Sequence, residues 1–238
     1  MLIVERLIAR SFLSGYVPTQ AAKPDAPLTP LDSTYLSDAS SLDAPVIAST
    51  YSDFGGARTY YLFAYDRGAN REASYKLSEI GLDRPAYLYD LMAGSGRLVE
   101  PEESLTETIA GGWLYRVVAP VGRSGIALLG DTGHFVSMGK KRVTHFSDDG
   151  IVRLTIAFAP AETSRTIRGY SPDPPAAWAT TGSAGGAKYD AATHEFQVAV
   201  SPGPDGTASL LIARHRARIP ESSTRPDGPI ERRLPFRP

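Results

Sequence analysis

The sequence contains no cysteine among its 238 residues. Disulfide frameworks, thiolate metal sites and cysteine nucleophiles all need the sulfur atom of this side chain, so each of them is excluded. The chain also has no excess of either charge, with 25 basic and 26 acidic side chains and a formal net charge of -1. Because no broad electropositive face is available, we do not expect nucleic acid as a partner.

Long apolar runs are missing as well. No segment approaches the roughly 18 apolar residues of a membrane-spanning helix. The opening MLIVERLIAR is interrupted by Glu5, Arg6 and Arg10, so it lacks the uncharged core of a signal peptide. Its apolar spacing predicts a short amphipathic helix or an extended segment packed on a sheet, with a membrane anchor as the alternative. We expect a soluble protein with no membrane partner. The lack of cysteine favours the cytoplasm slightly, although the compartment stays open.

The sequence is rich in turn residues, with 22 glycines and 19 prolines. These residues separate short runs of branched and aromatic side chains, which are typical of β-strands. The runs recur about every 8–12 residues without alternating helices, and this spacing predicts an all-β fold of antiparallel sandwiches. The predicted strands are Val46–Tyr51, Thr59–Tyr65, Tyr75–Ile80, Pro85–Leu91, Leu105–Ala110, Trp113–Ala119, Ile126–Leu129, His134–Met138, Val143–Phe146, Ile151–Phe158, Arg165–Tyr170, Ala176–Thr180, Glu195–Val200 and Thr207–Arg214.

About a dozen strands are more than one small sandwich needs, so two consecutive sandwiches are predicted. The Asp149-Gly150 and Asp205-Gly206 pairs are expected to be hairpin turns, because this dipeptide supplies the positive φ of a two-residue loop. The last segment carries seven arginines against three acidic residues. The predicted organisation is an N-terminal segment and linker at 1–44, a first β-sandwich at 45–140, a second at 141–213 and a basic, proline-rich tail at 214–238.

Catalytic motifs are weak. The four histidines, His134, His145, His194 and His215, have no metal-site spacing, so no metal site and no cofactor are expected. Asp131 in Gly130–Gly133 could orient His134, but the segment is better explained as a turn. The segment Gly122–Gly125 approaches a serine nucleophile elbow, yet its second glycine comes one place early. The paired acids Glu102-Glu103 and Asp148-Asp149 are interpreted as solvated turn residues.

Aromatic side chains are the other candidate for a site. Within the groups 60–65, 87–89 and 113–115, residues two apart share a sheet face. Such a face can stack on sugar rings, and a sandwich core uses the same residues. The candidate saccharide-stacking residues are Tyr61, Trp113, Tyr115 and Trp178.

Several segments together resemble a known family. PAYLYDLMAGSGRLV at 85–99, GGWLYRVVAPVGRSGIALLGDTGHFVSMGKK at 111–141 and VIASTYSDFGGARTYYLFAYDRG at 46–68 resemble the C-terminal β-sandwich of glycoside hydrolases of the α-galactosidase and α-glucosidase type. TIRGYSPDPPAAWATTG and AKYDAATHEFQVAV are similar to the distal sandwich of the same enzymes. The resemblance covers about residues 46–212 and rests on hydrophobic pattern and turns.

The resemblance does not extend to a catalytic barrel. Such enzymes carry their catalytic carboxylates on barrel loops, and a barrel needs about 200 residues or more. Lys23-Pro24-Asp25 superficially resembles the Lys-x-Asp of the nucleophile but has no apolar strand before it, so no catalytic residue is carried over. We therefore expect a non-catalytic accessory β-sandwich region, separated from a larger carbohydrate-active enzyme, with a saccharide or a separate barrel as partner. The alternatives are a stand-alone carbohydrate-binding module and a ligand-free structural or interaction protein.

Overall fold

The computed structural model describes residues 25–26, 28–31, 45–66, 72–132 and 142–214. Within these ranges the regular structure consists of antiparallel strands and two short 3-10 helices, with no α-helix. The predicted all-β class is confirmed. The predicted N-terminal helix, the strand His134–Met138 and nearly all of the basic tail lie outside the described residues.

The first part of the chain forms a six-stranded antiparallel sheet in the order β1-β2-β3-β8-β5-β6. Both of its faces carry apolar side chains. Tyr60, Leu62 and Ala64 point to one side of β3, and Tyr61 and Phe63 point to the other. The strands are β1 (Thr29–Pro30), β2 (Val46–Asp53), β3 (Arg58–Tyr65), β5 (Ala86–Asp90), β6 (Ser95–Val99) and β8 (Trp113–Pro120).

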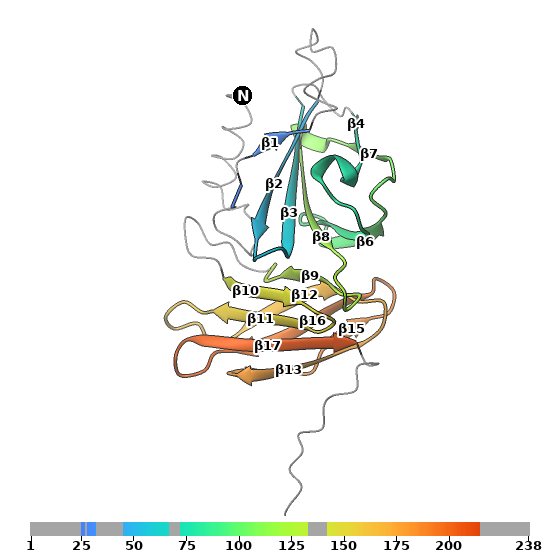
Figure 1. The fold of residues 1–238 in the computed structure, drawn as a ribbon. Helices are drawn as coiled ribbons and strands as arrows, with labels where there is room; N and C mark the ends of the chain where they lie inside the picture. Colours follow the sequence, from blue (N-terminus) through green and yellow to red (C-terminus); the bar gives the residue numbers. More distant parts are fainter. Residues whose placement is uncertain (1–24, 27, 32–44, 67–71, 133–141, 215–238) are drawn as a thin grey trace, which may run out of the picture.

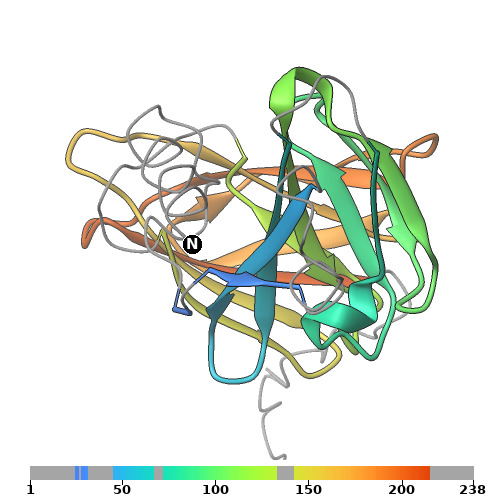
Figure 2. The same ribbon diagram turned by 90° about the horizontal axis from the view of Figure 1, so that it is seen from above.

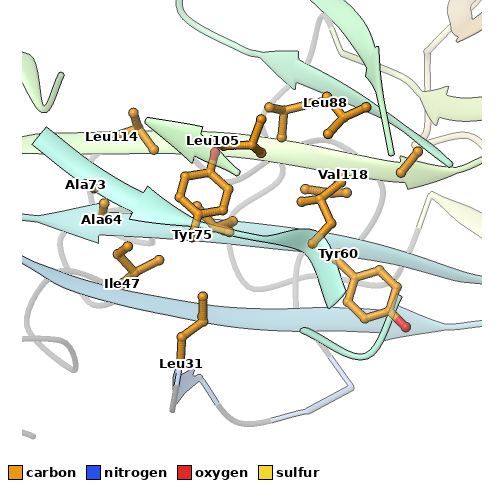
Figure 3. Packing of buried hydrophobic residues seen from close by; sticks show 14 of the residues in the cluster. Leu31, Ile47, Tyr60, Ala64, Ala73, Tyr75, Leu88, Leu105, Leu114 and Val118 are labelled. Atoms are coloured by element: carbon orange, nitrogen blue, oxygen red, sulfur yellow. The ribbon is translucent and has the colours of Figure 1, made fainter. Parts of the chain in front are cut away.

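A small second layer covers one face of this sheet. It consists of the two-stranded sheet formed by β4 (Glu72–Tyr75) and β7 (Leu105–Thr108), together with the 3-10 helix η1 (Leu77–Ile80). A second 3-10 helix, η2 (Ala110–Gly112), leads into β8. The core between the layers holds Tyr75 and Leu105 from the small sheet against Ala64 and Val118 from the large one (Figure 3). This arrangement is the first sandwich.

The second sandwich consists of two larger sheets. One has the order β10-β11-β17-β13, and the other has the order β14-β16-β12-β9, with β15 also paired to β16. The side chains of Leu154, Ile167, Phe196 and Ile212 fill the space between them. The strands are β9 (Ala127–Gly130), β10 (Val143–Asp148), β11 (Val152–Ala157), β12 (Arg165–Tyr170), β13 (Pro175–Thr181), β14 (Ser183–Ala184), β15 (Lys188–Asp190), β16 (Glu195–Ser201) and β17 (Thr207–Arg214).

The two sandwiches are stacked on each other (Figure 1). In this view β2 and β3 stand upright, and the strands of the second sandwich run across below them. Seen from above, β2 and β3 cross over the second sandwich (Figure 2). Strand β9 lies between the two parts: it follows β8 in the chain and pairs with β12 of the second sandwich. The chain therefore enters the second sandwich before residue 140, the end of the predicted first domain.

Glycine permits the close approach of β9 to β12. A Cβ atom at Gly169 would lie 2.6 Å from the carbonyl oxygen of Ala127 and 2.6 Å from the ring of Phe196. The pairing shifts register between Arg168 and Gly169. A larger side chain at this position would push β9 away from the sheet, so glycine helps to set the position of the strand that lies between the sandwiches.

Some predicted elements differ from the structure. The segment Tyr75–Ile80, predicted as a strand, ends β4 and then forms η1, which closes with Gly81 in the left-handed region at φ 81°. Strand β6 was missed because its sequence, SGRLV, is mostly polar and exposed at a sheet edge. Strand β1 lies in the segment predicted as a linker, where it pairs with β2.

The two Asp-Gly pairs have different roles. Asp149-Gly150 joins the paired strands β10 and β11, as predicted for a hairpin. Asp205-Gly206 was also predicted to be a hairpin turn, and this was wrong: β16 and β17 belong to different sheets, so the turn carries the chain from one layer to the other. Both glycines have positive φ, as predicted. The predicted pairing of the strands on either side of Asp205-Gly206 was wrong.

Candidate functional site

The four candidate saccharide-stacking aromatics lie in different environments. Tyr61 is 2% exposed and Tyr115 is 3% exposed, and both belong to the cluster on the second face of the six-stranded sheet. Trp113 is 38% exposed at the start of β8, and Trp178 is partly buried on β13. Burial leaves Tyr61 and Tyr115 no ring face for a ligand. For Trp113 and Trp178 the stacking role stays a prediction, and the structure places these two on different sandwiches.

The cluster containing Tyr61 and Tyr115 joins the two sandwiches, and we call this contact the joint. Tyr87, Tyr89 and Val117 of the first sandwich pack there with Ala127 and Leu129 of β9. The ring of Tyr87 stacks on Tyr170 of β12 at 4.9 Å between centroids. Its hydroxyl donates a hydrogen bond of 2.9 Å to Oε1 of Glu195, a carboxylate only 8% exposed. Burial, with this bond to Glu195, raises the pKa of Tyr87 above its ordinary value.

Two loops extend the joint. At the tip of the β2–β3 hairpin, Phe54 packs edge-on against Phe146 of β10 at 5.8 Å. In the β8–β9 connection, the hydroxyl of Ser124 donates to Oδ2 of Asp148 at 2.6 Å and accepts the backbone N–H of Ile126 at 3.1 Å. The serine of the weak nucleophile-elbow match thus anchors a turn. Asp148 was interpreted as a solvated turn residue, and this is corrected: its carboxylate accepts hydrogen bonds from Ser124 in the connection between the sandwiches.

The acidic pair Glu102-Glu103 lies at the surface, as expected, with ion pairs to Lys76 and Arg97. His145 and His194 are exposed, on β10 and in the turn before β16. His194 shares a 2.6 Å hydrogen bond through Nδ1 with the hydroxyl of Tyr189. His134 and His215 lie outside the described residues.

An ion network occupies one end of the second sandwich. Arg142 is 6% exposed and contacts Oδ2 of Asp131 at 3.1 Å. It also donates to both carboxylate oxygens of Glu162, at 2.6 and 2.9 Å, while Arg165 pairs with Glu162 from the other side. The two arginines hold the pKa of Glu162 below its usual range. Asp131 was interpreted as part of a simple turn, and its burial at 2% with two arginines corrects that interpretation.

The first sandwich contains a pocket of about 220 Å³ that sequence reasoning missed. It lies between the segment leading into and through β1, the end of β2, and η1. Hydrogen bonds hold its outer wall to β2: the backbone N–H of Asp25 donates to the carbonyl of Tyr51 at 2.9 Å, and the hydroxyl of Thr50 donates to that of Ala26 at 2.6 Å. The lining residues are Ala26, Thr29, Pro30, Leu31, Ser49, Thr50, Tyr51, Tyr60, Glu79 and Ile80.

Two tyrosines and one carboxylate give this pocket its chemistry. Tyr51 is partly exposed and lies 5.7 Å from the buried ring of Tyr60, at an angle of 56°. The hydroxyl of Tyr60 points away from the aliphatic core (Figure 3). The carboxylate of Glu79 accepts the backbone N–H of Lys76 at 2.8 Å, which fixes it on η1. Tyr60 belongs to the aromatic run at 60–65 that the sequence pattern singled out. The sequence pattern does not predict that η1 lies next to it.

An ion pair stands beside the pocket. The guanidinium of Arg58 lies 4.3 Å from the centre of the Tyr51 ring and donates to Oδ2 of Asp53 at 2.8 Å. The carboxylate of Asp53 also accepts the backbone N–H groups of Gly55 and Gly56. The bond from Gly56 and the one from Arg58 lower the pKa of Asp53 to about 2. Asp25, from the weak Lys-x-Asp match, accepts the backbone N–H of Asp53 at 2.7 Å, which is a structural role.

Comparison with known proteins gives no family: no protein-family model and no curated protein matches the chain. Across the described ranges, no group of three or more histidine or acidic side chains has the arrangement of a metal site. Among these same residues, no helix has the length and apolarity to cross a bilayer.

We predict that Glu162→Gln destabilises the second sandwich by about 3 kcal/mol, because it leaves buried Arg142 with one carboxylate partner. The folded pKa of Glu162 lies below the ordinary 4.5, so its stabilisation is present above that pH and is lost as the pH falls. Urea unfolding at several pH values measures both effects. The variant should lose less stability than the wild type between about pH 4.5 and pH 3.

The matched control is Glu102→Gln, which removes an exposed ion pair with Lys76. It should leave the free energy of unfolding unchanged within the error of the measurement, because solvent screens an exposed ion pair. Equal effects of the two substitutions would contradict a special role for the buried network.

We also predict that Tyr87→Phe lowers the free energy of unfolding by about 1–3 kcal/mol, because Glu195 loses a donor at a buried position. Urea unfolding again provides the measurement. Tyr189→Phe is the control, since its hydroxyl bonds to exposed His194 and to the carbonyls of Ser171 and Pro172, all within one sandwich. Its cost should stay below about 1 kcal/mol. A Tyr87 variant as stable as the wild type would mean that the Tyr87–Glu195 bond does not stabilise the joint.

Proposed function

We propose that the chain is a non-catalytic accessory unit of a glycoside-hydrolase-like, carbohydrate-active protein, with its two sandwiches held together by the joint. In this role the chain packs against, stabilises or docks a catalytic part. The observation that carries the proposal is the use of the aromatic sheet face. Tyr61, Tyr87 and Tyr115, which could have formed a saccharide platform, are buried where the sandwiches meet.

The geometry of the joint supports a positioning role. A flexible pair of domains is usually connected through a small, polar interface. Here the contact combines a stacked pair of rings, Tyr87 and Tyr170, with a buried hydrogen bond to Glu195 and an anchored connection at Asp148. Breaking it would expose aromatic surface and leave a buried carboxylate with one donor fewer. Such a contact favours two sandwiches that act as one body.

The described carboxylates whose pKa is shifted serve as anchors, which suits an accessory role. A glycosidase general acid needs a raised pKa so that it carries a proton near neutral pH. Among the described carboxyl groups whose pKa is shifted, every one is lowered: Asp53, Asp83, Glu102, Glu103, Glu162 and Asp205. Their causes are backbone N–H donors, hydroxyls and cationic side chains, which stabilise the ionised form. Such groups serve as anchors better than as proton donors.

We predict that the purified chain does not hydrolyse 4-nitrophenyl α- or β-galactosides and glucosides faster than a buffer blank. Release of 4-nitrophenol over a range of pH values measures this directly. A contaminating enzyme would give turnover that substitutions in the chain do not alter, so any signal is followed in single carboxylate variants. Turnover that one such substitution abolishes would overturn the non-catalytic assignment.

A further inference from the structure

We propose that the pocket between β1, β2 and η1 binds a single neutral sugar ring. This inference goes beyond the accessory role and does not depend on it, because a pocket on the first sandwich can bind a saccharide whatever that sandwich is attached to. The aromatic residues of this pocket, Tyr51 and Tyr60, are not among the saccharide-stacking candidates that the sequence suggested. The pocket's size, shape and charge each narrow the choice of ligand.

The size of the pocket favours one ring. Pockets for drug-sized ligands usually measure about 300–1,000 Å³, and this one measures about 220 Å³. Its walls come from three separate parts of the chain, the segment around Pro30, the end of β2 with Tyr51, and η1 with Glu79. The hydrogen bonds from Asp25 and Thr50 fix the first of these to the second, so the space is formed before a ligand arrives.

The lining combines an aromatic surface with hydrogen-bonding groups. Tyr51 supplies a partly exposed ring, with Arg58 over one face of it and Tyr60 tilted against it. Ser49 is partly exposed on the same face of β2 and can donate or accept. Glu79 uses one carboxylate oxygen to accept the N–H of Lys76 and has the other to accept from a ligand hydroxyl. A sugar ring presents the matching surfaces, C–H groups for the aromatic ring and hydroxyls for the polar groups.

The charges around the pocket argue for a neutral ligand. Arg58 already lies over the ring of Tyr51, so a cationic ligand would meet a positive charge at the same aromatic group. Glu79 in the wall opposes an anion, and beside the pocket the charge of Asp53 is balanced by its ion pair with Arg58. A quaternary ammonium compound and a carboxylated sugar are therefore disfavoured relative to an uncharged pyranose.

The experiment is a titration of the ¹⁵N-labelled full chain, followed by amide chemical shifts. The probes are methyl glycosides of galactose, glucose and xylose, with tetramethylammonium and glucuronate as charged alternatives. At least one neutral glycoside should give saturable shifts at the amides of Ser49, Tyr51 and Glu79. A ligand this small implies a Kd on the order of 1 mM. Tyr51→Ala should raise this Kd at least about tenfold, because it removes the exposed ring.

Glu79→Gln is the second variant. It should raise the Kd about threefold or more, because the one amide oxygen stays with Lys76 and the ligand meets an N–H₂ group, which cannot accept a hydrogen bond. That amide oxygen can still accept from Lys76, so η1 should keep its fold, which the variant's own amide spectrum checks. Trp113→Ala is the control for the exposed aromatic outside the pocket and should change the Kd less than about twofold.

Several outcomes would overturn the proposal. One is the absence of saturable shifts with every neutral glycoside up to about 50 mM. Another is binding of tetramethylammonium or glucuronate in preference to the neutral sugars. A third is loss of binding in Trp113→Ala with Tyr51→Ala unaffected, which would place the sugar on the exposed tryptophan. None of these results bears on whether the chain hydrolyses glycosides, so the accessory assignment is tested separately.

Discussion

The six-stranded sheet of the first sandwich has apolar side chains on both faces, and this constraint determines how the rest of the molecule is arranged. One face is covered by β4, β7 and η1, which pack on residues such as Leu62 and Val118. The other face carries a group of tyrosines that would be costly to leave in water. Strand β9 and the sheet of the second sandwich cover it. The second sandwich thus completes the burial of the first.

The polar contacts of the joint follow from that burial. A buried tyrosine is stabilised by a partner for its hydroxyl, which Tyr61 and Tyr87 have and Tyr115, among the described residues, does not. The hydroxyls of Tyr61 and Ser52 share a hydrogen bond of 3.1 Å, and the hydroxyl of Tyr87 donates to the carboxylate of Glu195 across the joint. Glu195 in turn can remain buried because that hydroxyl donates to it. Hydrophobic packing therefore supplies the contact area, and the hydrogen bond from Tyr87 to Glu195 ties one sandwich to the other.

Much of the fold could be predicted because strand signals are local. Branched and aromatic runs located most strands, and two of them, Arg165–Tyr170 and Thr207–Arg214, have the predicted bounds. What failed depends on contacts distant in sequence. Strand β6 is polar because it lies at an exposed edge, and Asp205-Gly206 has hairpin geometry although its flanking strands pair elsewhere. Of what the resemblance implied, the structure confirms only the all-β class with several antiparallel sheets.

The site could be predicted less well. Period-two spacing placed Tyr61 and Phe63 on one face, yet it could not say that a second sandwich would bury Tyr61. Asp131 looked like a turn residue because its partners, Arg142 and Arg165, come later in the chain. The pocket was missed because Tyr51 and Glu79 belong to different elements, which only the folded first sandwich brings together.

The most direct test of the account is whether the two sandwiches tumble as one body. Backbone ¹⁵N relaxation of the 25.5 kDa chain gives a rotational correlation time for each sandwich separately. The buried joint predicts that amides in β2, β3 and β8 report the same tumbling as those in β11, β16 and β17. Two clearly different correlation times, each that of a smaller body, would contradict the account and mean that the tyrosine face does not hold the sandwiches together.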